Sequence, residues 1–248
     1  MDKIFNNIIS DKTSGSSELL QKLVYYFYRR ISDGKAVKKE IETALNNLEH
    51  FAVIKYHLKK LELLMSKENK QSILSYLSSV IENEADIYQK IFTAIPLQIK
   101  NNKKIFTLSN SKTVYEVLKF WHQYNKNILI TIAESQPECE GKLLFNKLKK
   151  IDVKTELVHD NAISKHIEKS DLLLLGCDII MKNGDIINKT GSRDAAIIAK
   201  YFNKPVVVVS SKLKRISIRK PLIKGRNESE KFLFEKVENE LISLIVAE

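Results

Sequence analysis

The spacing of apolar residues changes at Pro96, and this change constrains the fold more than any other feature of the sequence. Before Pro96 there is no proline, and glycine occurs only at positions 15 and 34. Apolar residues in this part recur at intervals of three and four, the spacing of one buried helix face. The pattern predicts about four helices, with apolar stripes at 19–31, 37–48, 51–65 and 73–91. Without internal repeats or sustained heptads, residues 1–100 are predicted to form a helical bundle.

Short apolar runs rich in β-branched residues follow Pro96 and are separated by stretches with helical spacing. The runs lie at 104–108, 128–133, 153–158, 171–176 and 205–210. Continuous apolar runs of this length are typical of parallel strands buried on both faces. The stretches between them, at 110–124, 138–150, 162–169 and 192–202, have the spacing of crossover helices. The alternation predicts an α/β fold with a Rossmann-like, doubly wound parallel sheet in residues 101–248.

A hairpin is predicted to interrupt this alternation. The segments 179–182 and 185–188 flank Asn183-Gly184, a pair favoured in two-residue type I′ turns. Isoleucines at 179, 180, 186 and 187 give the hairpin more apolar surface than a solvated hairpin needs. We expect it to project from the carboxyl edge of the sheet and to be covered by the helical half or by another subunit. The tail at 228–246 is predicted to form one more helix.

The composition limits the classes of ligand and partner that this chain is expected to bind. Forty-one Lys and Arg residues against 30 acidic ones give a net charge of +11, which favours an anionic ligand, RNA or an acidic protein. The lysines are spread along the chain, so the charge supports RNA binding only weakly. No apolar stretch approaches the roughly 20 residues of a membrane span, and no leader is evident, so a cytoplasmic location is expected. The spacing of Cys139 and Cys177 fits neither a metal site nor a redox motif, and we expect no cofactor.

Polar residues follow the predicted strands where each strand ends. In an open parallel sheet, ligands bind beyond the carboxyl ends of the strands. Asp160 and Ser211 are interpreted as helix caps. Asp178 precedes a hairpin instead of a helix, and is therefore interpreted as a functional carboxylate. Further candidates at strand ends are Ser109, Asn110 and Glu134.

Two segments are candidates for holding a phosphate. The run at 188–192 combines a cation, a glycine and hydroxyls at a predicted helix N-terminus, although it is not a P-loop. The run at 14–16 precedes the first predicted helix, and taken alone is more typical of a cap. Parallel topology predicts one cleft that contains Ser109, Asp178 and Lys189. The other predicted ligand-binding residues are Ser14, Gly15, Ser16, Asn110, Glu134, Asn188, Gly191 and Ser192.

The order and spacing of several motifs resemble those of one superfamily. The series consists of Gly176-Cys177-Asp178, then Asn183-Gly184-Asp185, then Asn188-Lys189-Thr190-Gly191-Ser192. It is similar to the motifs shared by the α, β and δ regulatory subunits of translation initiation factor 2B and by the isomerases of methylthioribose 1-phosphate and ribose 1,5-bisphosphate. The segments 107–111, 133–137 and 141–144 extend the resemblance upstream.

Departures from the isomerase pattern separate the possible functions. The resemblance implies that the isomerases use a cysteine and an aspartate as an acid-base pair. Asp178 matches the aspartate, but Ser109 stands at the cysteine position, and a serine hydroxyl exchanges protons poorly near neutral pH without a base. Gln136 stands at the position of an arginine that could hold phosphate. These departures favour a non-catalytic protein over an isomerase.

The leading hypothesis is therefore a protein of the initiation factor 2B regulatory-subunit type with a role in translation initiation. The resemblance implies a homodimer or higher oligomer formed through the α/β half, and contact with the α subunit of initiation factor 2. The anion pocket would take a phosphorylated small molecule such as a sugar phosphate or nucleotide. The alternative is a sugar-phosphate aldose-ketose isomerase that uses Asp178 with a different acid.

Overall fold

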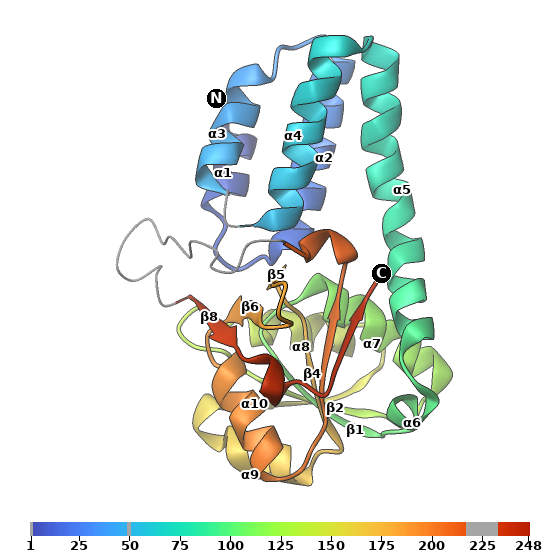
Figure 1. The fold of residues 1–248 in the computed structure, drawn as a ribbon, viewed down its shortest axis with the longest axis vertical. Helices are drawn as coiled ribbons and strands as arrows, with labels where there is room; N and C mark the ends of the chain where they lie inside the picture. The colour runs from blue at the N-terminus through green and yellow to red at the C-terminus, as the bar shows by residue number, and fades with distance from the viewer. Residues whose placement is uncertain (1, 49–50, 217–232) are drawn as a thin grey trace.

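A computed structural model describes residues 2–48, 51–216 and 233–248, and shows a helical half standing on an α/β half (Figure 1). The helical half is larger than the apolar stripes predicted, because α1 was not expected. Phe5 and Ile8 of α1 are buried against the bundle. The helices before the sheet are α1 (Lys3–Ser10), α2 (Ser16–Ser32), α3 (Lys38–Asn47), α4 (Ala52–Lys67), α5 (Lys70–Ala94) and the short α6 (Leu97–Lys100).

Helix α5 connects the two halves without a break and runs along one side of the molecule (Figure 1). Ile73 and Leu77 in its first part pack in the core of the bundle. Tyr88 and Ile91 in its last part pack against the sheet and its helices. A single 25-residue helix thus contributes to both cores. The division at residue 100 stays a prediction.

The central sheet confirms the predicted fold class. Its six strands run in the order β3-β2-β1-β4-β7-β9, and all neighbours are parallel. Helices α5, α7 and α8 pack on one face, and α9 and α10 on the other. The strands are β1 (Lys104–Leu108), β2 (Leu129–Ala133), β3 (Lys154–Val158), β4 (Leu172–Leu175), β7 (Val206–Ser210) and β9 (Leu244–Ala247). The crossover helices are α7 (Lys112–Tyr124), α8 (Gly141–Lys149), α9 (Ile163–Lys169), which follows the 3-10 turn η1 (Asp160–Ala162), and α10 (Ser192–Tyr201).

The strand order reverses between β1 and β4. From β1 the chain moves outward through β2 and β3, then crosses back to β4 on the other side of β1. The crevice at such a reversal is where open α/β sheets bind ligands. Ser109 follows β1 and Asp178 follows β4 closely, so both lie at this switch point.

The predicted C-terminal helix is wrong. The described part of the tail forms β8 (Phe234–Val237), the 3-10 turn η3 (Asn239–Leu241) and β9, while residues 228–232 lie outside the described residues. Strand β9 pairs with β7, and β8 pairs antiparallel with β6. Both partners offered an open edge of unpaired N–H and C=O groups, and satisfying them outweighed a weak helical pattern.

The hairpin is present, but its turn differs from the prediction. Strands β5 (Ile179–Ile180) and β6 (Ile186–Lys189) are antiparallel. Met181 and Asp185 close a three-residue loop, since Met181 N donates to Asp185 O and Gly184 N donates to Met181 O. Of the pair Asn183-Gly184, only Gly184 has a positive φ (+87°), whereas a type I′ turn needs two.

The apolar surface of the hairpin is covered within the chain, as expected. Ile180 and Ile186 are fully buried in the core beneath α10. Ile179 and Ile187 pack with Met181, and Ala52 of the helical half lies against them. The hairpin therefore contributes to the contact between the two halves.

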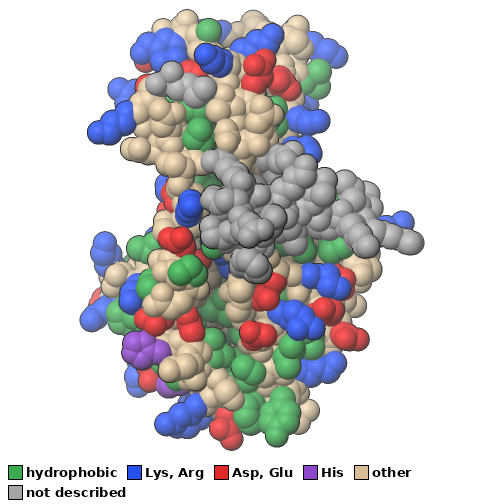
Figure 2. Space-filling view, turned by 90° about the vertical axis from the view of Figure 1, so that its left-hand side faces the viewer, with side chains coloured by type: hydrophobic (Ala, Val, Ile, Leu, Met, Phe, Trp, Pro, Cys, Tyr) green, Lys and Arg blue, Asp and Glu red, His purple; other side chains and the backbone are tan. Residues whose placement is uncertain are grey.

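Charged side chains of both signs are dispersed over one face of the molecule (Figure 2). On the face shown in Figure 2, Lys and Arg side chains lie over both halves with acidic side chains between them. In the part of the chain that the structure describes, no helix has both the length and the apolar character needed to cross a bilayer.

Candidate functional site

A polar cleft lies at the switch point, between the sheet, the hairpin and the start of α2. The fold brings most of the predicted site residues together there. The cleft has a volume of about 20 Å³, which is room for about one water molecule. The predicted residues that line it are Gly15, Ser16, Ser109, Asn110, Asp178, Asn188 and Lys189. Ser14, Glu134, Gly191 and Ser192 do not line it.

Asp178 is held at the cleft by its backbone. Its N–H donates to Ile187 O across the hairpin, at 2.8 Å. The residue is only 8% exposed, and among the described residues no hydrogen bond or ion pair reaches its carboxylate. A buried carboxylate without a partner is costly, which is typical of a group reserved for a ligand or for chemistry.

Ser109 has a strained backbone and a partnered hydroxyl. Its φ is +65°, the left-handed region that non-glycine residues rarely adopt, and its N–H donates to Ser135 Oγ at 2.7 Å. The Ser109 hydroxyl donates to Glu140 Oε1 at 3.3 Å. This buried glutamate, which sequence reasoning missed, therefore controls where the serine proton points.

Lys189 is bound by the same carboxylate oxygen. Its Nζ lies 3.3 Å from Glu140 Oε1, donates to Lys12 O at 3.2 Å, and stands 5.2 Å from the centre of the Phe234 ring. Glu140 is only 4% exposed. The ammonium predicted to hold a phosphate is thus neutralised by an internal carboxylate.

The N-terminus of α10 also has an internal acceptor. Gly191, with φ +94°, begins the helix, and Arg193 N donates to Glu235 Oε1 of β8 at 2.8 Å. Burial raises the pKa of Glu235, and the hydrogen bond from Arg193 N opposes that rise. The hydroxyl of Ser192 donates to Lys189 O and accepts from Asn188 Nδ2. At this helix start the Arg193 N–H is therefore already bound to an internal carboxylate and not to a ligand.

The start of α2 reaches the cleft from the helical half. Gly15 begins the helix, and Ser16 Oγ is buried without a hydrogen-bond partner among the described residues. Ser14 is turned away, since its Oγ accepts from Lys22 Nζ at 2.8 Å. Opposite them, Asn110 Oδ1 accepts from Lys147 Nζ at 3.2 Å. Gly15 and Ser16 thus line the cleft, whereas Ser14 lies outside its lining and binds Lys22.

Glu134 lies outside the cleft. It contacts His159 Nδ1 at 3.0 Å and Lys142 Nζ at 3.3 Å, and the bond with His159 lowers the pKa of Glu134 to about 2. Asp160 does not cap its own helix as predicted, but accepts from the backbone N–H groups of Ser135 and Gln136. Ser211 does act as a cap, accepting from Leu213 N at 3.3 Å in the turn η2 (Lys212–Lys214).

Sequence reasoning missed two cations that line the cleft, Lys112 and Lys214. Lys214 is 3% exposed, lines the cleft, and donates to Cys177 O at 2.8 Å, its one hydrogen bond to the described residues. Two of its three N–H donors remain for a ligand. Cys177 does not replace the missing catalytic cysteine, because burial raises the pKa of its thiol to about 11. Neither Lys214 nor Glu140 follows a strand directly, so strand-end reasoning did not select them.

These features define a class: a Rossmann-like α/β protein with a helical N-terminal half and a charged cleft at the switch point. The sequence model of the initiation factor 2 subunit family matches residues 7–240, so the chain belongs to that family. It is 35% identical over 136 residues to "Translation initiation factor eIF2B subunit alpha" of Caenorhabditis elegans, covering 55% of this chain and 45% of that protein. It is 28% identical over 148 residues to "Ribose 1,5-bisphosphate isomerase" of Archaeoglobus fulgidus, covering 60% and 47%. The matches thus span about half the length of these curated relatives.

Solved structures show the same fold. The translation initiation factor eIF-2B of Pyrococcus horikoshii superimposes with a TM-score of 0.78 at 18% identity, covering 98% of this chain and 93% of that one. The 5-methylthioribose 1-phosphate isomerase of the same organism gives 0.80 at 16% identity, covering 99% and 82%. Initiation factor subunits and isomerases therefore share this architecture, and the cleft has to distinguish between them.

Proposed function

We propose that this chain is a non-catalytic member of the family, of the initiation factor 2B regulatory-subunit type, which binds a phosphorylated small molecule in the cleft and a protein partner at its surface. The observation that carries the proposal is the contact of one Glu140 oxygen with both Ser109 and Lys189. It engages the hydroxyl and the ammonium that an isomerase of this pattern would need for its substrate.

The lack of a second acid-base group supports the absence of catalysis. Aldose-ketose isomerisation moves hydrogen between neighbouring carbons, which requires groups that take and return protons. Asp178 could serve as one. The other position holds the hydroxyl of Ser109, whose proton is directed at Glu140, and the neighbouring Cys177 is a protonated thiol at neutral pH. We therefore expect no turnover.

The charge of the cleft supports anion binding. Among the described lining residues are three lysines, Lys112, Lys189 and Lys214, and one carboxylate, Asp178, while Glu140 pairs with Lys189 from outside the lining. The cleft has room for about one water, so a sugar phosphate could enter only after the start of α2 and the hairpin move apart. Its phosphate would then replace Glu140 as the partner of Lys189. Ligand binding should therefore be weakened by competition with Glu140, and Glu140→Gln should bind phosphates more tightly than the wild type.

The test combines product analysis with binding. Ribose 1,5-bisphosphate and methylthioribose 1-phosphate should be recovered unchanged after incubation, and ribose 1,5-bisphosphate should raise the melting temperature. Lys189→Ala should weaken binding by on the order of 1 to 3 kcal/mol, the range of a charged hydrogen bond. Lys182→Ala, an exposed lysine in the same hairpin, is the matched control. Turnover that disappears in Asp178→Asn would overturn the non-catalytic proposal, and unchanged stabilisation in Lys189→Ala would overturn the assigned pocket.

Assembly with other subunits belongs to the same proposal. One structural neighbour is the tetrameric eIF2B-beta2-delta2 complex from C. thermophilum, at a TM-score of 0.76 and 16% identity. We propose a homodimer or higher oligomer formed through the α/β half, and contact with the initiation factor 2 α subunit. Light scattering of the purified chain and co-purification with that subunit test the two parts separately. A strictly monomeric chain would contradict the first, and absence of the complex the second.

One observation favours the isomerase alternative. The hydrogen bond of 3.3 Å between Ser109 Oγ and Glu140 Oε1 gives the serine a carboxylate that could accept its proton. In that case Glu140→Gln would abolish turnover. In the non-catalytic protein the same substitution tightens phosphate binding, so one variant separates the two functions.

A further inference from the structure

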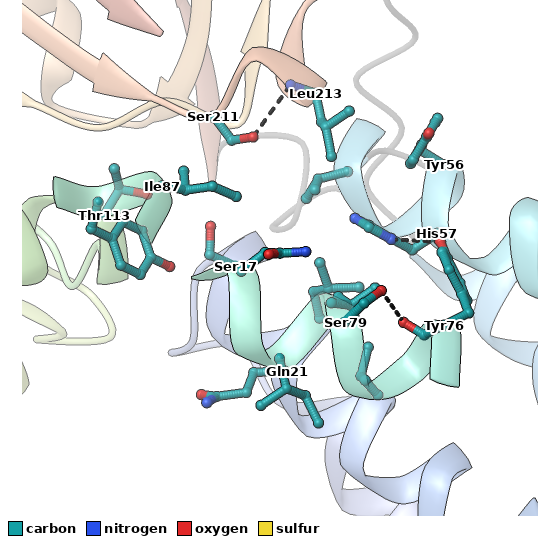
Figure 3. A pocket seen from close by; sticks show the side chains of 17 residues that line it. Ser17, Gln21, Tyr56, His57, Tyr76, Ser79, Ile87, Thr113, Ser211 and Leu213 are labelled. Carbon is teal, nitrogen blue, oxygen red and sulfur yellow. Dashed lines mark hydrogen bonds between the residues drawn. The ribbon is translucent and has the colours of Figure 1, made fainter. Parts of the chain in front are cut away.

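A second and larger cavity lies between the two halves, with a volume of about 270 Å³ (Figure 3). Helices α2, α4 and α5 form its walls on the bundle side, and Thr113 of α7, Ser211 and Leu213 close it on the α/β side. Of the described residues, Ser17 alone lines both this cavity and the switch-point cleft. The cavity is slightly smaller than the roughly 300 Å³ at which ordinary ligand pockets begin, which suits a small ligand.

The described residues that line this cavity carry no formal charge at neutral pH. None of them is Asp, Glu, Lys or Arg, although these residue types make up 29% of the chain. Leu20, Val24 and Val53 are among its apolar lining residues. A charged ligand would lose its hydration there without gaining a counter-charge, whereas an apolar one would gain by burial.

Aromatic rings gather at one end of the cavity. The rings of Tyr56 and His57 meet edge to face at 5.1 Å, and His57 Nδ1 lies 2.9 Å from the Tyr76 hydroxyl (Figure 3). Burial lowers the pKa of His57 to about 4, so its ring is neutral at physiological pH. Ser79 Oγ donates to Tyr76 O in the same wall. This end thus offers flat apolar faces and neutral hydrogen-bonding groups, the usual surroundings of an aromatic ligand.

We propose that this cavity binds a small, neutral aromatic molecule that carries one hydrogen-bonding group, with the ring against Tyr56 and His57. The bound molecule would touch the bundle through α4 and the α/β half through Leu213. It would therefore hold the two halves together and raise the melting temperature. The site is independent of the phosphate proposal, because its chemistry excludes a phosphate.

Indole and indole-3-carboxylate are suitable probes, since they share a ring and differ in charge. Saturation-transfer NMR and thermal shift on the full chain should show saturable binding of indole, and binding of the carboxylate at least about tenfold weaker. Equal binding of the two probes, or no indole binding up to its solubility limit, would overturn the proposal. This comparison uses the wild type alone, so it does not depend on any variant folding.

Two tryptophan variants locate the site. Val80→Trp places a large ring in the cavity from α5, and should weaken indole binding at least about tenfold. Lys90→Trp adds the same ring at an exposed position of α5, and should bind indole like the wild type. Undiminished binding by a folded Val80→Trp would overturn the location. Stabilisation of Val80→Trp by ribose 1,5-bisphosphate should match that of the wild type, which keeps the two proposals separate.

Discussion

Neutral, partly buried His57 makes the stability of this protein depend on pH in a predictable direction. Burial in the bundle lowers the pKa of His57 from 6.5 to about 4. In the unfolded chain the pKa of His57 returns to its ordinary value. Below pH 6.5 the unfolded chain therefore binds a proton at this histidine that the folded protein does not bind. The stabilisation is fully present above the unfolded pKa and is lost as the pH falls towards 4. At the lower pH the full difference corresponds to at most about 3 kcal/mol, at 1.36 kcal/mol per pKa unit.

The replacement His57→Gln isolates this contribution. Glutamine keeps a polar group near the Tyr76 hydroxyl but does not titrate. We expect the free energy of unfolding in urea to fall by about 2 to 3 kcal/mol more in the wild type than in His57→Gln between roughly pH 7 and pH 4. The other titrating groups are the same in both proteins and cancel in the comparison. Tyr76→Phe removes the hydroxyl but leaves the ring buried, so it should keep the wild-type dependence. If His57→Gln loses as much stability as the wild type, burial of a neutral histidine is not the cause.

Three further predictions concern packing, capping and the cleft. Gly141→Ala should lower the free energy of unfolding in urea by about 3 kcal/mol, because a Cβ at this position would overlap the backbone oxygen of Ala133. If the variant is as stable as the wild type, α8 can shift freely and the reasoning is wrong. Glu235→Ala should cost about 0.5 to 2 kcal/mol by removing the acceptor at the start of α10, and an unchanged urea midpoint would refute the capping role. Lys214→Met should raise the melting temperature without ligand, since a buried ammonium with one acceptor is costly, and should reduce the stabilisation by ribose 1,5-bisphosphate. A lower melting temperature with full ligand response would contradict that reasoning.

Local pattern was sufficient for β1, β2, β4 and β7, which are buried on both faces, and also for the edge strand β3. The run at 104–108 forms β1 with the predicted bounds, and the runs for β2, β3, β4 and β7 differ by no more than a residue at either end. Strands in the middle of a parallel sheet are apolar along their whole length, so they can be recognised from the sequence alone. The short helix α1 was not predicted, because only two of its residues, Phe5 and Ile8, are buried, and two residues are too few to show a helical period.

Strand-end reasoning also placed most of the cleft. Ser109 and Asp178 come from β1 and β4, which the right-handed crossovers make neighbours at the switch point. Lys189 was selected as the cation of the run at 188–192, at the predicted start of a crossover helix. Chain order and handedness therefore determined which residues meet.

What the sequence determined by itself is the fold class, the hairpin and the meeting of Ser109, Asp178 and Lys189 in one cleft, because each depends on periodicity or on strand order. Only the tertiary structure decided how the charges in the cleft are paired. Glu140 reaches Lys189 from a distant helix start, and Glu235 caps α10 from the C-terminal β8. The tail became strands for the same reason, since β6 and β7 offered open edges that no local pattern records. Partners far apart in the chain satisfy buried charges and unpaired backbone groups, and their identity emerges only when the chain has packed.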